Sequence, residues 1–397
     1  MAEAILVLNA GSSSLKFALR AADDPDHSLL AGDIEEIGHG ARFAGAKGGD
    51  PAAPPPHLPP EADHGTALSA LLGWLERAAP GHRLMAAGHR VVHGGARFTA
   101  PARIDADTLR ALDALAPLAP LHQPHNLAAI RAVAAAAPDL PQVACFDTAF
   151  HAGIDPVAQA FAIPRDLAAE GIRRYGFHGL SYESIAARLP DLLGPAAGGR
   201  VIVAHLGAGA SLCAMRAGRS VGTTMGFTAL DGLVMGTRTG AIDPGVLLHL
   251  MTEKGWDAAR LTRMLYRESG LLGLSGRSAD MRVLLASDDE ASRFAVAVFV
   301  HRIVRETGAL AAMLGGLDAF VFTGGIGENA APVRAAVMEG CRWLGLVPDA
   351  AANAAHGPAI SAPGPVTAWV VPTDEEGAIA RATARLLGLS RGRSAAS

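Results

Sequence analysis

The sequence predicts an α/β protein that contains a duplicated domain. Apolar, strand-like runs alternate with helix-like patterns along the chain, and this order of mixed elements is typical of α/β architecture. The stretch at 200–215 also repeats the order found at 5–19, namely an apolar run, a glycine-rich turn and a second apolar run. The length of 397 residues allows two or three domains.

Composition narrows the class of protein. The chain is 50% hydrophobic and 18% charged, which provides for large cores and excludes a disordered protein. Its formal net charge is −4 and no run of Lys or Arg stands out, so nucleic-acid and membrane binding have no electrostatic basis. The three scattered cysteines argue against disulfides. The N-terminus does not resemble a signal peptide, and no apolar stretch reaches the roughly 20 residues of a membrane span. We therefore expect a soluble cytoplasmic protein.

The N-terminal elements begin with a hairpin. Strands are expected at 5–8 and 15–19, joined by the turn at 9–14. The stretch at 46–62 is dense in Pro, Gly and Ala and predicts a surface loop. A helical pattern follows at 66–78.

Further strand-like runs end at glycines or at a carboxylate. A short buried strand is expected at 88–95, where it ends in glycines, and a helical pattern follows at 106–115. The strand at 142–146 ends at Asp147. In the second half, the stretch at 319–333 passes from a strand through glycines into a helix.

The chain ends in a predicted helix. Thr373 and Glu376 have the spacing of a capping box at its start.

Three glycine-rich turns follow apolar strands: NAGSSS (9–14), HLGAGAS (205–211) and TGGIGEN (323–329). Glycine lets backbone N–H groups approach an anion closely, and small hydroxyl groups add donors without bulk. Any one of these turns could simply reverse the chain. Together they suggest a polyphosphate held between two lobes. None is a P-loop, and none opens a βαβ dinucleotide-binding unit.

The chain resembles the acetate kinases over nearly its whole length. The strings that carry this resemblance occur in the family's order: NAGSSSLKF, GHRVVHGG, FDTAFH, RYGFHGLSY, AHLGAGASL, GFTALDGLVMGTRTGAIDPG, SGLLGLSGRSADMR, FTGGIGENA and PTDEEGAIA. The resemblance implies the two-lobe, actin-like ATPase fold, in which duplicated ribonuclease-H-like domains with mixed sheets hold ATP in the cleft between them. It implies an N-terminal lobe at 1–148, completed by a C-terminal helix at 374–397, a nucleotide-binding lobe at 149–373, and a homodimer.

The implied activity is reversible phosphoryl transfer from ATP to acetate, which gives acetyl phosphate and ADP by direct in-line transfer. A kinase for propionate or another short-chain acid is the alternative within this class. A non-catalytic nucleotide-binding protein of the same superfamily is the alternative outside it. The fold alone would also allow a carbohydrate kinase, but such an enzyme needs a base and a larger polar pocket.

Four residues are the catalytic candidates. The resemblance assigns Arg90 to the acyl substrate, Arg238 to the transition state, and His178 to a hydrogen bond with the transferring phosphoryl group. The acceptor carboxylate is already ionised at neutral pH, so the site needs positive charge and no base. We therefore expect Asp147 to orient an arginine or the acyl substrate. On spacing alone, Asp147 could equally make a turn bond, and His178 could be a core histidine.

The resemblance also supplies the binding residues. Asn9 and Glu375 would associate with Mg²⁺ (or Mn²⁺), although Glu375 could simply complement a helix dipole. The acyl group would be held by Arg90, Val92, Leu121, His122 and Phe177. The nucleotide and its phosphates would be held by Ser12, Ser14, Lys16, His205, Leu206, Gly207, Ala208, Gly209, Asp280, Met281, Arg282, Gly325, Ile326, Gly327, Glu328 and Asn329.

Several positions depart from the commonest family pattern. Ala208 replaces an Asn, which removes one polar contact near the nucleotide. Gln123 replaces an Asn and keeps an amide. Leu180 and Tyr182 replace a Thr and a His, and Ala241 replaces an acid.

Ala229 stands where a proline is usual. In the family that proline helps to wall the pocket for the acyl methyl group. Its replacement predicts a slightly roomier pocket that tolerates propionate better. The effect should be modest, because one methylene group is worth only about 1–3 kcal/mol in an apolar pocket.

Overall fold

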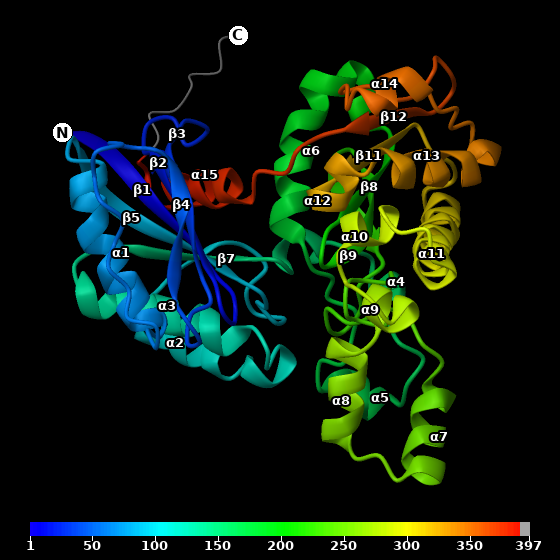
Figure 1. Cartoon of the computed structure of the whole chain (residues 1–397), viewed down its shortest axis with the longest axis horizontal. Coiled ribbons are helices and arrows are strands. Elements are labelled where there is room, and N and C mark those ends of the chain that lie inside the picture. Colours follow the sequence, from blue (N-terminus) through cyan, green and yellow to red (C-terminus); the bar gives the residue numbers. More distant parts are fainter. Residues whose placement is uncertain (390–397) are drawn as a thin grey trace. The chain divides into compact units, whose positions relative to one another are not determined.

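The computed structural model describes residues 1–389. The chain divides into two compact units (Figure 1). The first unit contains Met1–Phe150 together with the segment that begins at Asp374, and the second contains His151–Thr373. The chain therefore leaves the first unit near residue 150 and returns to it for its last helix.

The first unit is built on a mixed sheet with the strand order β4-β3-β2-β1-β5-β7-β6. β1, β5 and β7 run parallel to one another, and the other four strands join antiparallel. The strands are β1 (Ala2–Ala10), β2 (Leu15–Ala21), β3 (Ser28–Glu35), β4 (Arg42–Gly48), β5 (His82–Val91), β6 (Ala102–Arg103) and β7 (Gln142–Phe146). Residues 4–8 of β1 are all buried, as expected for a central strand that is covered on both faces.

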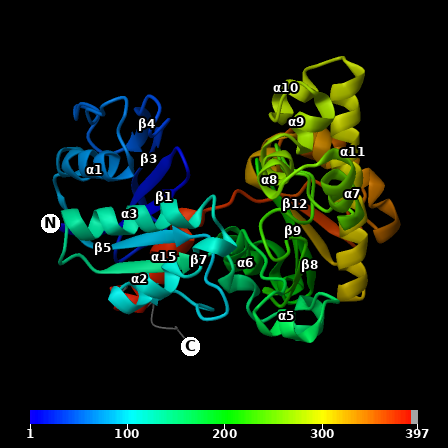
Figure 2. The same cartoon turned by 90° about the horizontal axis from the view of Figure 1, so that it is seen from below.

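Helices cover both faces of this sheet, with α1 and α3 on one side and α15 on the other (Figure 2). The helices of the unit are α1 (His64–Ala78), α2 (Ala106–Asp113), α3 (Gln123–Ala136) and α15 (Glu375–Leu387), with a 3₁₀ turn η1 (Ala116–Leu118). Gly88 in β5 lets α15 lie directly on the sheet, because a Cβ there would come within 2.6 Å of Ile379 Cγ2 and 2.4 Å of Thr383 Oγ1.

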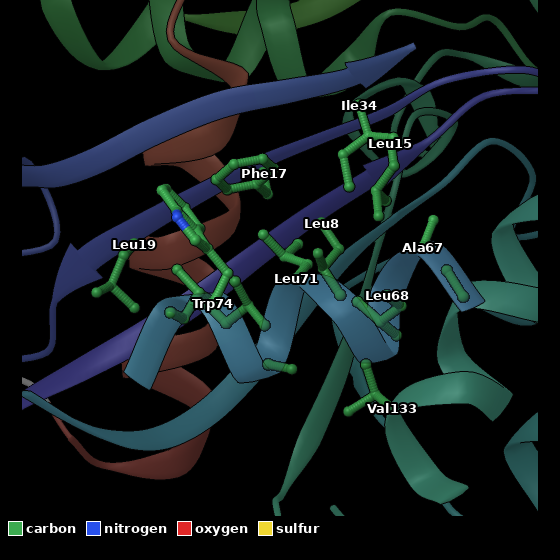
Figure 3. Close-up of a cluster of buried hydrophobic side chains, with 14 of the residues drawn as sticks. Leu8, Leu15, Phe17, Leu19, Ile34, Ala67, Leu68, Leu71, Trp74 and Val133 are labelled. Carbon is green, nitrogen blue, oxygen red and sulfur yellow. The ribbon is translucent and has the colours of Figure 1, made fainter. Parts of the chain in front are cut away.

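The core of the first unit lies between β1, β2 and α1 (Figure 3). The side chain of Asp63 caps α1 by accepting the Thr66 amide at 2.8 Å, and buried apolar residues then recur at helical spacing. Trp74 from this stripe packs edge-on against Phe17 of β2, with ring centroids 5.9 Å apart. The helix predicted at 66–78 is therefore confirmed, and its apolar stripe is what holds it to the sheet.

The structure corrects three details of the sequence interpretation. Residues 46–48 belong to β4, and Ala53 and Leu58 pack against the core, so the stretch at 46–62 is only partly a surface loop. The strand expected at 88–95 is the end of β5, which stops at Val91.

The capping box at the last helix is also wrong. Asp374, and not Thr373, caps α15 by accepting the Gly377 amide at 2.9 Å. The helix ends at Leu387 because Gly388 takes a φ of 67°. Residues 390–397 of the predicted C-terminal helix lie outside the described residues.

The second unit repeats the same plan. Its sheet has the order β10-β9-β8-β11-β12, with β8, β11 and β12 parallel and β9 and β10 antiparallel. This order corresponds to β3-β2-β1-β5-β7 of the first unit, which confirms the duplication inferred from the sequence. The strands are β8 (Arg200–Leu206), β9 (Ala210–Arg216), β10 (Arg219–Thr223), β11 (Ala319–Thr323) and β12 (Thr367–Val370).

The helices of the second unit surround this sheet and extend away from it. They are α4 (Pro156–Gln159), α5 (Arg165–Ala169), α6 (Gly179–Leu193), α7 (Pro244–Lys254), α8 (Ala258–Arg267), α9 (Gly270–Ser275), α10 (Met281–Leu285), α11 (Glu290–Leu314), α12 (Gly324–Asn329), α13 (Ala331–Gly340) and α14 (Ala350–Ala354). Three 3₁₀ turns are also present: η2 (Ala149–His151), η3 (Gly194–Gly198) and η4 (Arg342–Leu344). The chain passes from the first unit to the second at η2. Among residues 1–389, no helix has both the length and the apolar character of a membrane span.

Candidate active site

In the first unit, three parallel strands end at one edge of the sheet and bring Asn9, Arg90 and Asp147 together. Arg90 Nη2 donates to Asp147 Oδ2 at 2.6 Å, and its Nε lies 3.2 Å from both carboxylate oxygens. Arg90 Nη1 donates to Asn9 Oδ1 at 3.2 Å. The carboxyl edge of parallel strands is where α/β proteins place their ligands, so this cluster is a candidate ligand site of the first unit.

The charges around Arg90 keep its guanidinium protonated and fixed in place. The side chain of Asp147 is 2% exposed and that of Arg90 is 23% exposed. Burial alone lowers the pKa of the Arg90 guanidinium, but the charges of Asp147 and Glu375 outweigh it and raise that pKa overall. Arg90 therefore stays charged, and Asp147 holds its guanidinium in one orientation.

Glu375 adds a second carboxylate at the N-terminus of α15. Burial raises the pKa of Glu375, Arg90 lowers it, and the charge of Asp147 raises it again. A divalent cation would relieve this crowding of negative charge, and the oxygens of Asn9 and Glu375 are the hard donors that Mg²⁺ prefers. No group of three or more His, Cys, Asp or Glu forms a metal site among residues 1–389. Two protein ligands fit Mg²⁺, which keeps several waters.

The NAGSSS turn joins β1 to β2 beside this cluster. The Gly11 amide donates to the Ser14 carbonyl at 2.8 Å, and a Cβ on Gly11 would lie only 2.9 Å from Ser14 Oγ. Ser12 and Lys16 are exposed, and Lys16 pairs with Asn9 across the two strands. Glycine makes the turn tight, and the exposed hydroxyl and ammonium groups remain available to an anion.

The acyl candidates of the first unit lie where β5 leaves the sheet and where α3 begins. Val92 is buried, and its amide donates to Asn126 Oδ1 at 3.0 Å. Asn126 in turn donates to the Ala10 carbonyl at 2.7 Å. Leu121 and His122 immediately precede α3. The sequence analysis missed Asn126, because a single amide outside the family strings gave no signal of its own.

Gln123 fixes the same loop from the other side. Its Oε1 accepts the His93 amide at 3.2 Å, and its Nε2 donates to the His93 carbonyl at 3.1 Å. The replacement of the usual Asn therefore keeps both amide functions. Phe177, the remaining acyl candidate, belongs to the second unit, where it is 2% exposed.

In the second unit, His178 and Arg238 converge on the HLGAGAS turn. A Cβ on Gly209 would lie 3.0 Å from His178 Nε2 and 3.7 Å from Arg238 Nη2. Arg238 Nη1 donates to the Ala229 carbonyl at 2.8 Å. The ring of His178 stacks on that of His205, with centroids 4.3 Å apart. A cation and an imidazole nitrogen thus face one glycine turn, an arrangement suited to a phosphoryl group.

A pocket of about 800 Å³ begins at the same turn. Eight of the thirteen second-unit residues predicted for the nucleotide line it: Gly207, Ala208, Asp280, Met281, Arg282, Gly325, Ile326 and Asn329. Ala279, Leu285, Ala330 and Pro332 complete the lining and were not predicted. This volume lies in the range of small-molecule and cofactor sites.

The other five predicted nucleotide residues of the second unit lie outside the pocket lining. They are His205, Leu206, Gly209, Gly327 and Glu328. Glu328 Oε1 accepts the amides of Gly324 at 2.9 Å and Thr373 at 3.1 Å, so it closes the turn after β11. His205 Nδ1 lies 2.8 Å from Ser181 Oγ.

Comparison with known proteins identifies the family of this chain. Residues 4–381 match the Acetokinase family. Acetate kinase from Rhodopseudomonas palustris (strain ATCC BAA-98 / CGA009) is 55% identical over 393 residues, which cover 97% of this chain and 99% of that protein. The solved structure of a propionate kinase from Francisella tularensis subsp. tularensis SCHU S4 is 37% identical, with a TM-score of 0.88 over 96% of this chain and 98% of that chain.

A second solved structure, Porphyromonas gingivalis acetate kinase, is 36% identical, with a TM-score of 0.86 over 97% of this chain and 100% of that chain. These likenesses extend over both units and include the strands that carry Arg90, Asp147 and the HLGAGAS turn. They support the predicted two-lobe, actin-like fold, since sequence and structure match from end to end. The chain belongs to the acetokinase family.

Proposed function

We propose that this chain transfers the γ-phosphoryl group of ATP reversibly to acetate, giving acetyl phosphate and ADP. The observation that carries this proposal is the convergence of His178 and Arg238 on Gly209, at the end of a nucleotide-sized pocket. Family membership and the 55% identity to an acetate kinase support the choice of reaction.

The chemistry follows from the charges. Arg90, held by Asp147, binds the acetate carboxylate, which is ionised at neutral pH and attacks without a base. Arg238 and the Nε2 edge of His178 receive the charge that spreads over the phosphoryl oxygens in the transition state. Asn9 and Glu375 would hold Mg²⁺, which neutralises phosphate charge when bound. The acceptor residues and the phosphoryl-binding residues belong to different units.

A hydroxylamine trap tests the reaction directly. The protein is incubated with ATP, Mg²⁺ and formate, acetate, propionate or butyrate, and any acyl phosphate is converted to its hydroxamate. We expect the strongest signal with acetate and a weaker one with propionate. The absence of a signal with all four acids would overturn the proposal and favour a non-catalytic nucleotide-binding protein or a carbohydrate kinase.

We also propose that the chain forms a homodimer through α7. No residue of this helix is buried, and three of its apolar side chains are largely exposed. The exposed fractions are 41% for Val246, 62% for Leu248 and 46% for Met251. A second copy of the chain would cover this apolar face. Light scattering of the wild type should give twice the mass of one chain, and Leu248→Glu should give the single mass. A monomeric wild type would refute the proposed homodimer.

We also propose that the protein is located in the cytoplasm. The three cysteines are free and buried, as expected in a reducing compartment.

A further inference from the structure

His178 is held in an unusual backbone conformation. Its φ is 59°, in the left-handed region, where a residue with a side chain stays only if its surroundings fix it. It occupies the cap position before α6. Nδ1 lies 2.9 Å from Ser211 Oγ, while Nε2 is the nitrogen nearest to Gly209. The two nitrogens therefore face different environments, one inside the fold and one at the turn shared with Arg238.

Tyr182 lies one helical turn after His178 on the same face of α6. Its side chain is fully buried, and its hydroxyl lies 2.5 Å from Ser211 Oγ. Ser211 is also fully buried. A single serine hydroxyl thus joins the phenol of Tyr182 to the imidazole of His178.

The chemistry of these groups bears on which atom donates in each of the two hydrogen bonds of Ser211. Burial raises the pKa of Tyr182 well above its ordinary value, so the phenol keeps its proton. The backbone amide of His205 acts on the phenolic oxygen in the opposite sense, as an N–H donor does. A phenol that keeps its proton can donate it to Ser211 Oγ, which lies 2.5 Å away. A serine that accepts from the phenol has its one proton left to donate to His178 Nδ1, at 2.9 Å.

We propose that Tyr182 is a positioning residue that, through Ser211, makes Nδ1 of His178 an acceptor and keeps the imidazole proton on Nε2. This inference rests on the proposed function, in which Nε2 donates to the transferring phosphoryl group. A neutral imidazole fixed in this tautomer remains a donor without having to gain a proton. Tyr182 stands where the sequence analysis expects a histidine from the family resemblance, so in this chain a phenol takes that place beside Ser211.

A cycle of variants tests whether Tyr182 acts through His178. Tyr182→Phe and Ser211→Ala are made alone, together, and in a His178→Gln background, and kcat for acyl phosphate formation is measured. We expect Tyr182→Phe to lower kcat roughly tenfold with little change in the KM for ATP, which is less than the 100-fold or greater loss of a whole transition-state donor. It should lower kcat no further when Ser211→Ala or His178→Gln is already present. An equal loss in the His178→Gln background would overturn the proposal.

Tyr175→Phe is the matched control. Tyr175 is also a buried tyrosine of the second unit, and its hydroxyl donates to the Gly171 carbonyl at 2.9 Å. Its loss removes a comparable hydrogen bond that is not connected to Nδ1 of His178, so kcat should stay within about twofold of the wild type.

A second readout does not depend on activity. In protein labelled with ¹⁵N-histidine, the signal of His178 is assigned by its absence from the His178→Gln variant, and the tautomer is read from the shifts of the two nitrogens. We expect Nε2–H in the wild type and a shift towards Nδ1–H in Tyr182→Phe. A wild type with Nδ1–H, or an unchanged tautomer in Tyr182→Phe, would overturn the proposal. If the wild type forms no acyl phosphate, the proposed function fails, while this measurement still tests the tautomer.

Discussion

At the scale of single residues, Gly209 is the point where the two phosphoryl-binding candidates meet. A Cβ on this residue would lie 3.0 Å from His178 Nε2 and 3.7 Å from Arg238 Nη2, so its missing side chain leaves room for both groups. The φ of Gly209 is not in the left-handed region, so the glycine is required by this close approach and not by the backbone.

Gly209→Ala should therefore impair catalysis more than folding. The new Cβ would lie 3.0 Å from His178 Nε2 and push the imidazole away from the turn. We expect kcat to fall by roughly 3- to 10-fold, because the imidazole must give way by only a few tenths of an ångström, whereas a full displacement of about 1 Å at a reacting centre costs on the order of 100-fold. Gly198→Ala is the matched control, since a Cβ there meets nothing within 4 Å. Equal activity of the two variants would contradict the assignment.

Asp147→Asn tests whether Asp147 orients Arg90. The variant keeps the shape of the side chain but removes the charge that holds the guanidinium. We expect the KM for acetate to rise by about tenfold or more, because charged hydrogen bonds to a carboxylate are worth roughly 1.5–3 kcal/mol. Asp113→Asn removes a comparable pair with Arg131 that is about half exposed, and it should leave acetate kinetics unchanged. A normal KM for acetate in Asp147→Asn would refute the orienting role.

Ala229→Pro tests the size of the acyl pocket. The Ala229 carbonyl accepts a hydrogen bond from Arg238, so this position adjoins a catalytic candidate. We expect the ratio of propionate to acetate kcat/KM to fall about 5- to 10-fold, because added ring atoms narrow the pocket and this factor is at the low end of the about 1–3 kcal/mol that one methylene group is worth. A higher ratio in the proline variant would contradict this.

At the scale of elements, the sequence predicted the helices and strands that can be recognised from their own residues alone. The helix at 66–78 shows a cap and a continuous apolar stripe, and the strand at 142–146 is a short apolar run. Both were correct. The predicted cap of α15 was wrong. Thr373 and Asp374 both precede the helix, and only tertiary contacts decide which of them caps it. Thr373 Oγ1 lies 2.9 Å from Ser181 Oγ, so it is engaged elsewhere.

Asp374→Ala should destabilise the N-terminus of α15. The aspartate caps the helix and also pairs with Arg20, whose Nη2 lies 2.5 Å from Oδ1. We expect the free energy of unfolding to drop by about 1–3 kcal/mol, from a cap worth roughly 1 kcal/mol and a partly buried ion pair. Asp374→Asn keeps a capping side chain, so its free energy of unfolding should drop less. Urea denaturation measures the drop for both variants. If the two variants were equally stable, the cap would contribute nothing.

At the scale of the whole molecule, the sequence revealed the duplication because both copies begin with the same hairpin. The common order of the five central strands could not be predicted, since strand pairing depends on contacts between residues far apart in the chain. Likewise, the motifs indicated candidate nucleotide-binding residues, but not that the Glu328 carboxylate would accept the Gly324 amide and close a turn. Such assignments require knowledge of which backbone amides lie near the carboxylate.

Stability should depend on pH through His89 in β5. This imidazole is buried, with Nε2 2.7 Å from Gln142 Oε1. Burial lowers the pKa of His89 to about 4, from an ordinary 6.5, although the bond to Gln142 raises it. Between these pH values the unfolded chain binds the proton and the folded chain does not. The free energy of unfolding should therefore fall as pH drops from about 6.5 towards 4, by up to about 1.4 kcal/mol per pH unit.

His89→Gln removes this titrating group. Urea denaturation at pH 7, 6 and 5 should show a flatter loss of stability in the variant than in the wild type. Identical slopes in the two proteins would show that His89 takes up its proton at the same pH in the folded and the unfolded chain, which would contradict the lowered pKa.

The return of the chain to its first unit has a consequence for biosynthesis. One face of β1, β5 and β7 is covered by α15, which is made after the whole second unit, and Gly88 leaves room for this helix. On the ribosome, this apolar face of the N-terminal sheet therefore stays uncovered while residues 151–373 are made. The first unit is completed only when α15 has left the exit tunnel, and Glu375 reaches Arg90 only at that moment.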